Sequence, residues 1–332
     1  MDEPEKRKRD DLLRAVFSLR AKVRGKTQAY GCFLDDPPFE SAPESSRCPM
    51  TVLDDDVELL VNTSLRYQSA GEVPREVRHC AAPLEGFMRG HSIAWVEETG
   101  SGMWTPFWLR GEWPDVINSL QPGAPAPSGL SAAMRRVLVD ANILVARDHE
   151  KSRSGEWGGA VRSAQTSYRA NGYAVIRGLI HPLQLGAMRR YYRALVAHGG
   201  LPLGDSQVSG RYRLHSELIA SFLHPQLAKI VGQIAREQVK PSYAYFASYQ
   251  AGADLPRHVD RDQCEFSISL LVDYMPDPNG PCGWPLFLEN PAITAKAHAA
   301  DLGVGDGVFY RGRELIHFRH PLPQGHQSTS IF

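Results

Sequence analysis

The short run His258-Val259-Asp260 combines the residue types and the spacing of a metal site. Side chains two residues apart in an extended segment point to the same face, so the imidazole of His258 and the carboxylate of Asp260 can reach one cation. A third ligand must come from a distant part of the chain. Two histidines and one carboxylate on one face of an octahedral ion leave three of its positions open to other molecules.

The third ligand has to be chosen from the histidines that follow this run, which are His298, His317, His320 and His326. His317 comes just after the run YRGREL, in a segment that can return to the same end of a sheet. A set of two histidines and one carboxylate is the arrangement with which non-haem Fe(II) oxygenases hold a cosubstrate and O2. The competing interpretation is structural, because H-x-D occurs by chance and a single histidine on a strand seldom binds metal.

The sequence around the motif changes from a helical to a strand-like period after Lys240. Before it, LIHPLQLGAMRRYYRALVAHG predicts a helix that begins near His181, and PQLAKIVGQIAREQ predicts a second helix over 225–238. After it, SYAYFASYQ and EFSISLLVDY alternate between two faces. In the second run, one face is predicted to carry Phe266, Ile268, Leu270, Val272 and Tyr274.

Three further short runs also predict strands: WPLFLE at 284–289, GVFYRG at 307–312 and STSIF at 328–332. The turns between them are rich in Gly, Pro, Asn and Asp, and no helical pattern intervenes. Several short strands at this spacing predict an antiparallel sandwich or barrel.

The N-terminal half contains no motif that points to chemistry. Residues 1–28 predict a helix, and its KRKR run is typical of a solvated helix start. The segment 146–159 is polar and contains glycines, so we interpret it as a boundary. We therefore expect an N-terminal region over 1–150, serving substrate recognition or dimerisation, and a second domain over 160–332.

The composition is that of an ordinary globular protein and argues against several classes. Of 332 residues, 37 are basic and 37 acidic, which argues against a protein that binds nucleic acid through bulk charge. We find no run of about 18 apolar residues for a membrane span and no apolar signal core in MDEPEKRKRDD. The five cysteines lack C-x-x-C spacing and are expected to be free thiols. We expect a cytoplasmic protein that binds neither nucleic acid nor membrane.

Over residues 165–332 the sequence resembles the Fe(II)- and 2-oxoglutarate-dependent oxygenases, in particular their prolyl-hydroxylase-like branch. The resembling segments are NGYAVIRGLI with the helix after it, PSYAYFASYQAGADLPRHVDRDQCEFSISLLVDY, and VGDGVFYRGRELIHFRHPLPQGHQSTSIF. The resemblance implies an α+β fold: a double-stranded β-helix (a jelly-roll or cupin-like barrel) flanked by helices, with a mixed N-terminal region. It also implies that His258, Asp260 and His317 hold iron and that Tyr249 lines the cosubstrate pocket.

The sequence departs from the family where the far carboxylate of 2-oxoglutarate is bound. Relatives have an arginine or lysine roughly ten residues past the distal histidine, since a cation pairs well with a carboxylate. That place holds Gln327 here. Either a nearby cation (Arg319, Arg311 or Arg313) substitutes, or the cosubstrate is held weakly, or it is a different molecule. The residues that we assign to the cosubstrate pocket are Tyr249, Gln327, Arg319 and Thr329.

The resemblance implies a dioxygenase that uses Fe(II), 2-oxoglutarate and O2 to hydroxylate or otherwise oxidise an unactivated C–H bond. No catalytic residue beyond the metal ligands is predicted. The substrate is expected to be a peptide, a protein side chain or a natural-product intermediate, and the N-terminal region leaves a homodimer open. Two alternatives remain at this point: a catalytically weak barrel that binds a ligand or partner, and a zinc hydrolase that uses the same three ligands.

Overall fold

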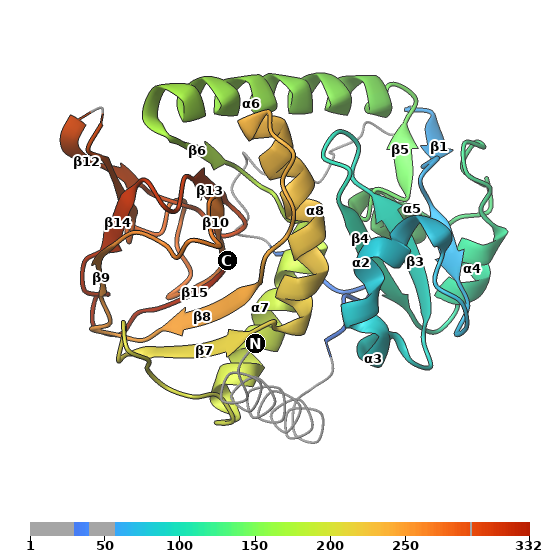
Figure 1. Cartoon of the computed structure of the whole chain (residues 1–332). Coiled ribbons are helices and arrows are strands. Elements are labelled where there is room, and N and C mark those ends of the chain that lie inside the picture. Colours follow the sequence, from blue (N-terminus) through green and yellow to red (C-terminus); the bar gives the residue numbers. More distant parts are fainter. Residues whose placement is uncertain (1–29, 40–56, 293) are drawn as a thin grey trace, which may run out of the picture.

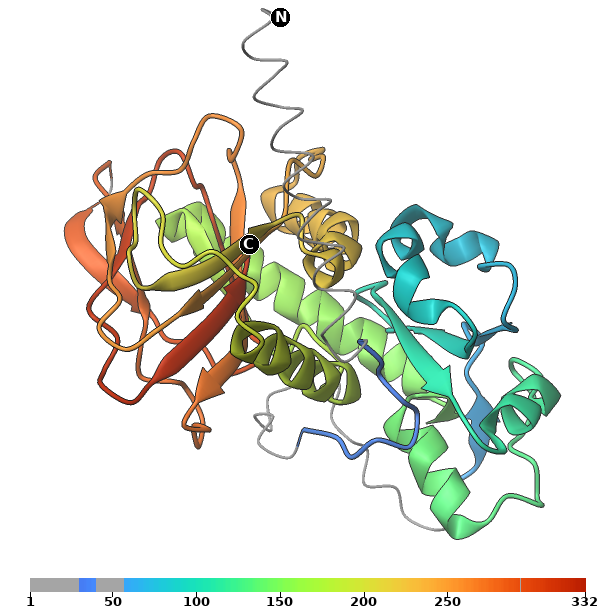
Figure 2. The same cartoon turned by 90° about the horizontal axis from the view of Figure 1, so that it is seen from below.

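The computed structural model describes residues 30–39, 57–292 and 294–332, so the helix predicted over 1–28 lies outside the described residues. Two groups of strands lie on either side of three long helices (Figures 1 and 2). The helices are α6 (His149–Asn171), α7 (Pro182–Ala197) and α8 (Leu218–Ala235). Every strand pair is antiparallel, so the predicted combination of helices and antiparallel sheets is confirmed.

The N-terminal elements form a small mixed layer. Strands β2 (Arg66–Gln68), β3 (Ser92–Glu97) and β4 (Trp104–Leu109) form one sheet, and β1 (Leu59–Val61) pairs with β5 (Leu144–Ala146). The short helices of this part are η1 (Arg75–Val77), α2 (Arg78–Ala81), η2 (Ala82–Leu84), α3 (Glu85–Met88), α4 (Trp113–Ser119) and α5 (Ala132–Asp140).

The C-terminal half contains two sheets. The larger has the strand order β6-β13-β10-β15-β8-β7, and the smaller has the order β12-β11-β14-β9. The larger sheet consists of β6 (Tyr173–Ile176), β7 (Arg211–His215), β8 (Tyr245–Tyr249), β10 (Ser267–Met275), β13 (Gly307–Tyr310) and β15 (Gln327–Ile331). The smaller consists of β9 (Leu255–His258), β11 (Leu286–Asn290), β12 (Thr294–Ala300) and β14 (Ile316–Arg319).

The inner face of the larger sheet follows from its register. Ser328 and Ser330 of β15 lie opposite Tyr249 and Ala247 of β8, so these four side chains share one face. The tyrosine ring centroid lies 5.2 Å from the Trp284 ring, just before β11, and the Tyr310 ring lies 4.8 Å from the His317 ring of β14. This face therefore points toward the smaller sheet, and the opposite face packs against α7, where Tyr192 stacks on Phe246.

A bulge in β10 alters the predicted alternation. The register with β15 shifts between Leu271 and Asp273, so Leu271 and Tyr274 both share the face of Ser328 and Ser330. The prediction that Tyr274 lies on the same face as Leu270 is wrong, because the extra residue reverses the alternation. Asp273 then faces the helix, where Arg189 and Arg193 of α7 bind its carboxylate at 2.7 Å each.

Two predicted helix starts have different outcomes. The helix predicted near His181 is α7, and the His181 imidazole caps it by accepting a hydrogen bond from the Leu183 N–H at 3.2 Å. The helix predicted from residue 225 begins earlier, at Leu218, because Glu217 accepts hydrogen bonds from the Ile219 and Ala220 N–H groups and caps it there. Pro225 is accommodated inside that helix.

The predicted boundary segment 146–159 is largely helical, since α6 begins at His149 and runs from the β5 side to β6 (Figure 1). Buried apolar side chains of both halves belong to one core cluster. The Trp104 N–H also donates to Oε1 of Gln226 across the two halves at 2.7 Å. The division into 1–150 and 160–332 stays a prediction.

The described cysteines, Cys32, Cys80, Cys264 and Cys282, are free thiols, as predicted for them. Within the described residues, no helix has the length and apolarity to cross a membrane.

Candidate metal centre

Three side chains from two neighbouring segments meet at one end of the space between the sheets. His258 ends β9 and lies directly opposite His317 of β14, so their rings are only 4.1 Å apart. Asp260 follows β9, and its Oδ1 is 3.5 Å from Nε2 of His317 and 3.9 Å from Nε2 of His258. Across the part of the chain that the structure describes, no other group of His, Cys, Asp or Glu side chains has comparable metal-ligand geometry.

The backbone orients both imidazoles. Nδ1 of His258 lies 2.8 Å from the Pro256 carbonyl, and Nδ1 of His317 lies 3.0 Å from the Leu315 carbonyl. A proton on Nδ1 that is donated to the carbonyl leaves the Nε2 lone pair free for a cation. Burial and the adjacent His317 lower the pKa of His258, which keeps this imidazole neutral and able to bind metal.

The Asp260 carboxylate is positioned by Ser267 and Gly312. The Ser267 hydroxyl donates to Oδ2 at 2.5 Å, which leaves Oδ1 directed at the histidines, and the Asp260 N–H donates to the Gly312 carbonyl at 2.7 Å. A Cβ on Gly312 would lie only 2.5 Å from both Oδ2 and the Ser267 hydroxyl. Although burial opposes ionisation, His317 and Ser267 together lower the pKa of Asp260, so it is a carboxylate at neutral pH.

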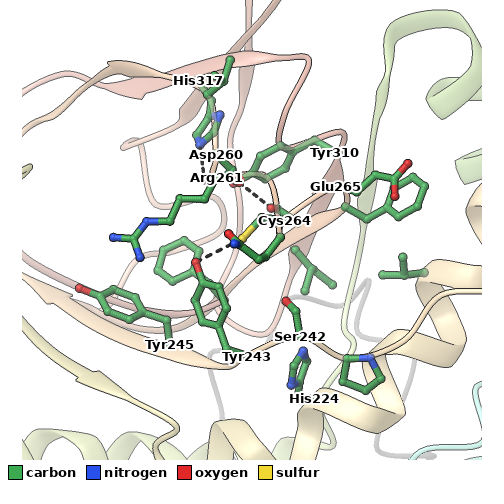
Figure 3. A pocket seen from close by; sticks show the side chains of 18 of the residues that line it. His224, Ser242, Tyr243, Tyr245, Asp260, Arg261, Cys264, Glu265, Tyr310 and His317 are labelled. Carbon is green, nitrogen blue, oxygen red and sulfur yellow. Dashed lines mark hydrogen bonds and ion pairs between the residues drawn. The ribbon is translucent and has the colours of Figure 1, made fainter. Parts of the chain in front are cut away.

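The three side chains open into a large cavity of about 1270 Å³ (Figure 3). It extends from His317 and Tyr310 between the sheets toward α8, where His224 lies on its wall. Its volume exceeds the range of about 300–1,000 Å³ that is usual for small-molecule pockets. The centre is therefore accessible to a bulky or extended molecule.

A buried cation, Arg319, lies two residues beyond His317 on β14 and therefore on the same face. Its Nη1 donates to the Trp284 carbonyl at 2.6 Å, and its guanidinium carbon lies 4.4 Å from the Trp284 ring centroid. Nη2 is buried without a hydrogen-bond partner, and within the described residues no carboxylate forms an ion pair with this guanidinium. Burial lowers the pKa of Arg319. A buried cation without a counterion is costly to fold, so an anion bound beside it would be stabilising.

Buried hydroxyls face the same space. Among the residues that the structure describes, the side-chain oxygens of Ser269, Ser328 and Ser330 have no hydrogen-bond partner, and all three lie on the inner face of the larger sheet. Buried polar groups are nearly always paired, so a group of unpaired ones is typical of a site that accepts a polar ligand.

The predicted cosubstrate residues separate into two groups. Tyr249 is buried on the inner face, where it accepts a hydrogen bond from Arg211 at 3.1 Å, and Arg319 faces the same space. Gln327 and Thr329 lie on the opposite face of β15, and the Thr329 hydroxyl donates to Ser248 at 3.0 Å. The structure therefore brings Tyr249 and Arg319 together and places Gln327 and Thr329 toward α7.

The other candidate histidines lie outside the cluster. His320 packs on Phe287 at 4.8 Å, and His326 pairs with the Tyr274 hydroxyl at 2.9 Å. The ring of His298 lies 6.1 Å from that of Tyr173.

Ser267, Gly312 and Arg211 are residues of the site that the sequence reasoning missed. Ser267 alternates with the apolar residues of EFSISLLVDY, a pattern that predicts its strand face but not its contact with Asp260. Nothing in the sequence distinguishes Gly312 from the other turn glycines.

No family model and no curated protein matches this chain. Several solved structures are similar to this chain. A Pseudomonas putida prolyl-4-hydroxylase is 18% identical with a TM-score of 0.42, and the match covers 52% of this chain and 95% of that one. A Trichoplax adhaerens prolyl hydroxylase in complex with a hypoxia-inducible-factor peptide fragment is 14% identical with a TM-score of 0.43. This match covers 54% of this chain and 91% of that one. The α-ketoglutarate-dependent epimerase SnoN from nogalamycin biosynthesis is 14% identical with a TM-score of 0.43. This match covers 52% of this chain and 81% of that one.

The similar structures include prolyl hydroxylases and other 2OG-Fe(II) oxygenases, and each match covers about half of this chain. Because the identities lie below 20% and the TM-scores below 0.5, the activity of this chain has to be inferred from its own side chains.

Proposed function

We propose that this chain is an Fe(II)- and 2-oxoglutarate-dependent oxygenase whose two C-terminal sheets form a double-stranded β-helix. The observation that carries the proposal is the pairing of two features in one inner space. One is a group of three ligand atoms, two imidazole nitrogens and one carboxylate oxygen, that lie within 4.8 Å of one another. The other is the buried guanidinium of Arg319, which has no carboxylate partner among the described residues.

The donor set fits Fe(II). His258, Asp260 and His317 would hold the ion on one face, and the cavity on the other side has room for a cosubstrate and O2. Within the described residues, no thiolate joins the three ligands, so the set differs from the closed cysteine-rich sites typical of structural zinc.

Arg319 would bind the far carboxylate of 2-oxoglutarate in place of the basic residue that Gln327 replaces. Its Nη2 and the hydroxyls of Ser328 and Ser330 are among the polar groups of the inner face that have no hydrogen-bond partner within the described residues. A charge-assisted hydrogen bond in this dry environment would be worth roughly 1.5–3 kcal/mol. Tyr249 would close the same pocket from β8.

When bound, the metal would supply the chemistry by which O2 oxidises 2-oxoglutarate to succinate and CO2, with one oxygen atom entering succinate and the other an unactivated C–H bond of the substrate. The chain would orient the reactants and exclude water. The backbone carbonyls of Pro256 and Leu315 fix the two imidazoles, and Ser267 keeps one carboxylate oxygen away from the ligand position. The size of the cavity favours a peptide, a protein side chain or a natural-product intermediate over a small free metabolite.

Succinate release tests this function. The purified full chain is incubated with 2-oxoglutarate and O2, with Fe(II) or Zn(II), and succinate is quantified by mass spectrometry. Fe(II)-dependent succinate that is absent in His317→Ala supports the proposal. No succinate with Fe(II) would favour the ligand-binding alternative, and a hydrolytic activity supported only by Zn(II) would favour the hydrolase.

A further inference from the structure

A second group of cations lines the cavity and is carried by strand β7 and by the segment after Asp260. Strand β7 carries Arg211, Arg213 and His215, and these lie opposite Tyr249, Ala247 and Tyr245 of β8. Because opposed residues of an antiparallel pair share a face, this row points into the cavity, and all three residues line it.

Arg261 adds a guanidinium from the opposite wall. It follows Asp260 directly, and in Figure 3 its side chain extends across the cavity with its guanidinium toward Tyr245. The ring of Tyr245 lies 4.7 Å from that of His215 and 5.5 Å from the guanidinium carbon of Arg211. Burial, and after it the charges of Arg213, Arg261 and Arg211, lower the pKa of His215. The positive charge here therefore comes from the arginines.

These cations are only partly neutralised. Asp205 binds Arg211 at 2.7 Å and lies 3.8 Å from Arg213, while Arg261 has no ion-pair partner among the described residues. Four other carboxylates line the cavity, those of Glu237, Asp260, Asp262 and Glu265. Glu237 interacts with Arg311 at 3.9 Å and Asp262 with Arg313 at 3.6 Å. The excess of positive charge is confined to this group, in which Arg211, Arg213 and Arg261 face the single carboxylate of Asp205.

The same opening exposes apolar surface. Val259, between two of the metal ligands, is 46% exposed, and Tyr243 is 37% exposed. Large apolar side chains are seldom exposed in the described part of the chain, and these two both line the cavity. Exposed apolar groups at a pocket opening are typical of a binding surface.

We propose that the substrate is an amphiphilic anion, with an apolar or aromatic body that packs on Tyr243 and Val259 and a carboxylate, phosphate or sulfate group bound by Arg213 and Arg261. The inference rests on the proposed function in one respect, which is that this cavity receives the substrate. It assigns Arg213 and Arg261 to substrate selection and leaves Arg319, with Tyr249 and its partner Arg211, to the cosubstrate.

A matched pair of fluorescent probes tests the proposal on the metal-free full chain. The probes are 8-anilinonaphthalene-1-sulfonate and the neutral N-phenyl-1-naphthylamine, which differ by the sulfonate. The sulfonate probe is expected to bind more tightly, and added salt is expected to weaken only that probe. Arg261→Gln and Arg213→Gln are each expected to lower the affinity for the sulfonate probe about fivefold, because a partly exposed ion pair contributes about that much to binding. Neither variant should change the affinity for the neutral probe.

Three variants complete the test. Arg261→Lys keeps the charge and should keep most of the affinity. Arg110→Gln removes a surface arginine that pairs with Asp35 at 2.9 Å, and Arg319→Ala removes the deep cation; neither should change probe binding. Equal affinity for both probes, or an equal loss in Arg110→Gln or Arg319→Ala, would overturn the proposal. Because no metal or 2-oxoglutarate is present, that failure is distinguishable from a failure to release succinate.

Discussion

The metal end and the Arg319 end of the same inner space are built in opposite ways. At the metal end, the polar atoms behind the ligands have partners: both Nδ1 atoms lie beside backbone carbonyls, and Oδ2 of Asp260 accepts from Ser267. At the other end, Nη2 of Arg319 and the hydroxyls of Ser328 and Ser330 are buried without partners. The first arrangement fixes ligand geometry before a cation binds, whereas the second carries a desolvation cost that an anion can remove.

The largest effect is expected at the metal end. Replacing His258, Asp260 or His317 by Ala removes one of three ligands and should weaken Fe(II) or Co(II) binding by more than about a hundredfold. The loss should exceed that caused by removing a residue that only hydrogen-bonds to a ligand. Isothermal titration under anaerobic conditions measures it. His320→Ala is the matched control, since this histidine packs on Phe287 outside the cluster. Metal binding that survives in His317→Ala but is lost in His320→Ala would show that the distal ligand is wrongly assigned.

The other end should lose the cosubstrate and keep the metal. Arg319→Met is expected to weaken 2-oxoglutarate about ten- to a hundredfold, because a buried charge-assisted bond is lost. The melting temperature of the ligand-free protein should not fall, since an uncompensated buried charge is removed. Differential scanning calorimetry with and without 2-oxoglutarate separates the two effects.

Gln327→Arg provides the matching control for Arg319. Gln327 lies on the α7 side of β15, so an arginine there is not expected to tighten 2-oxoglutarate binding. A clear gain of affinity in Gln327→Arg would mean that the far carboxylate lies at that strand and that Arg319 has another role.

The sequence predicts Asp260 as a candidate ligand but does not predict the residues that position its carboxylate. The period of two places His258 and Asp260 on one face without any knowledge of the fold, and the family resemblance selected His317. The faces of β15 were not predictable, because a shift of one residue exchanges Gln327 for Ser328, and only the pairing with Tyr249 fixes the register. The arginines of RYRLH were missed because β7 is a short edge strand whose neighbour β8 decides which side faces the cavity.

A smaller effect is expected from the residues that hold Asp260. Gly312→Ala would push a methyl group against Oδ2 and the Ser267 hydroxyl, and Ser267→Ala would release Oδ2. Each should weaken metal binding roughly tenfold, because the residue that hydrogen-bonds to a ligand, or packs against it, no longer holds that ligand in place. The same calorimetric titration measures both variants, with Gly200→Ala as a glycine control, because an added Cβ there meets no neighbour and the backbone has no positive φ. Unchanged metal affinity in Gly312→Ala would contradict the role of close packing at the carboxylate.

The smallest effect concerns the unpaired hydroxyls. Ser328→Ala and Ser330→Ala are each expected to weaken 2-oxoglutarate about two- to fivefold, since a neutral hydrogen bond contributes roughly 0.5–1 kcal/mol. Stability without ligand should stay unchanged, because these hydroxyls have no partner to lose. Full retention of 2-oxoglutarate affinity in both variants would confine the binding of the carboxylate to Arg319.

The most direct measurement is an anaerobic crystal structure of the full chain with Fe(II) and 2-oxoglutarate. The account predicts one ion bound by Nε2 of His258, Nε2 of His317 and Oδ1 of Asp260. It also predicts that the far carboxylate of 2-oxoglutarate lies within hydrogen-bond distance of the Arg319 guanidinium. An ion held by other side chains, or a cosubstrate carboxylate bound at Gln327 or at the β7 arginines with Arg319 still unpaired, would contradict it.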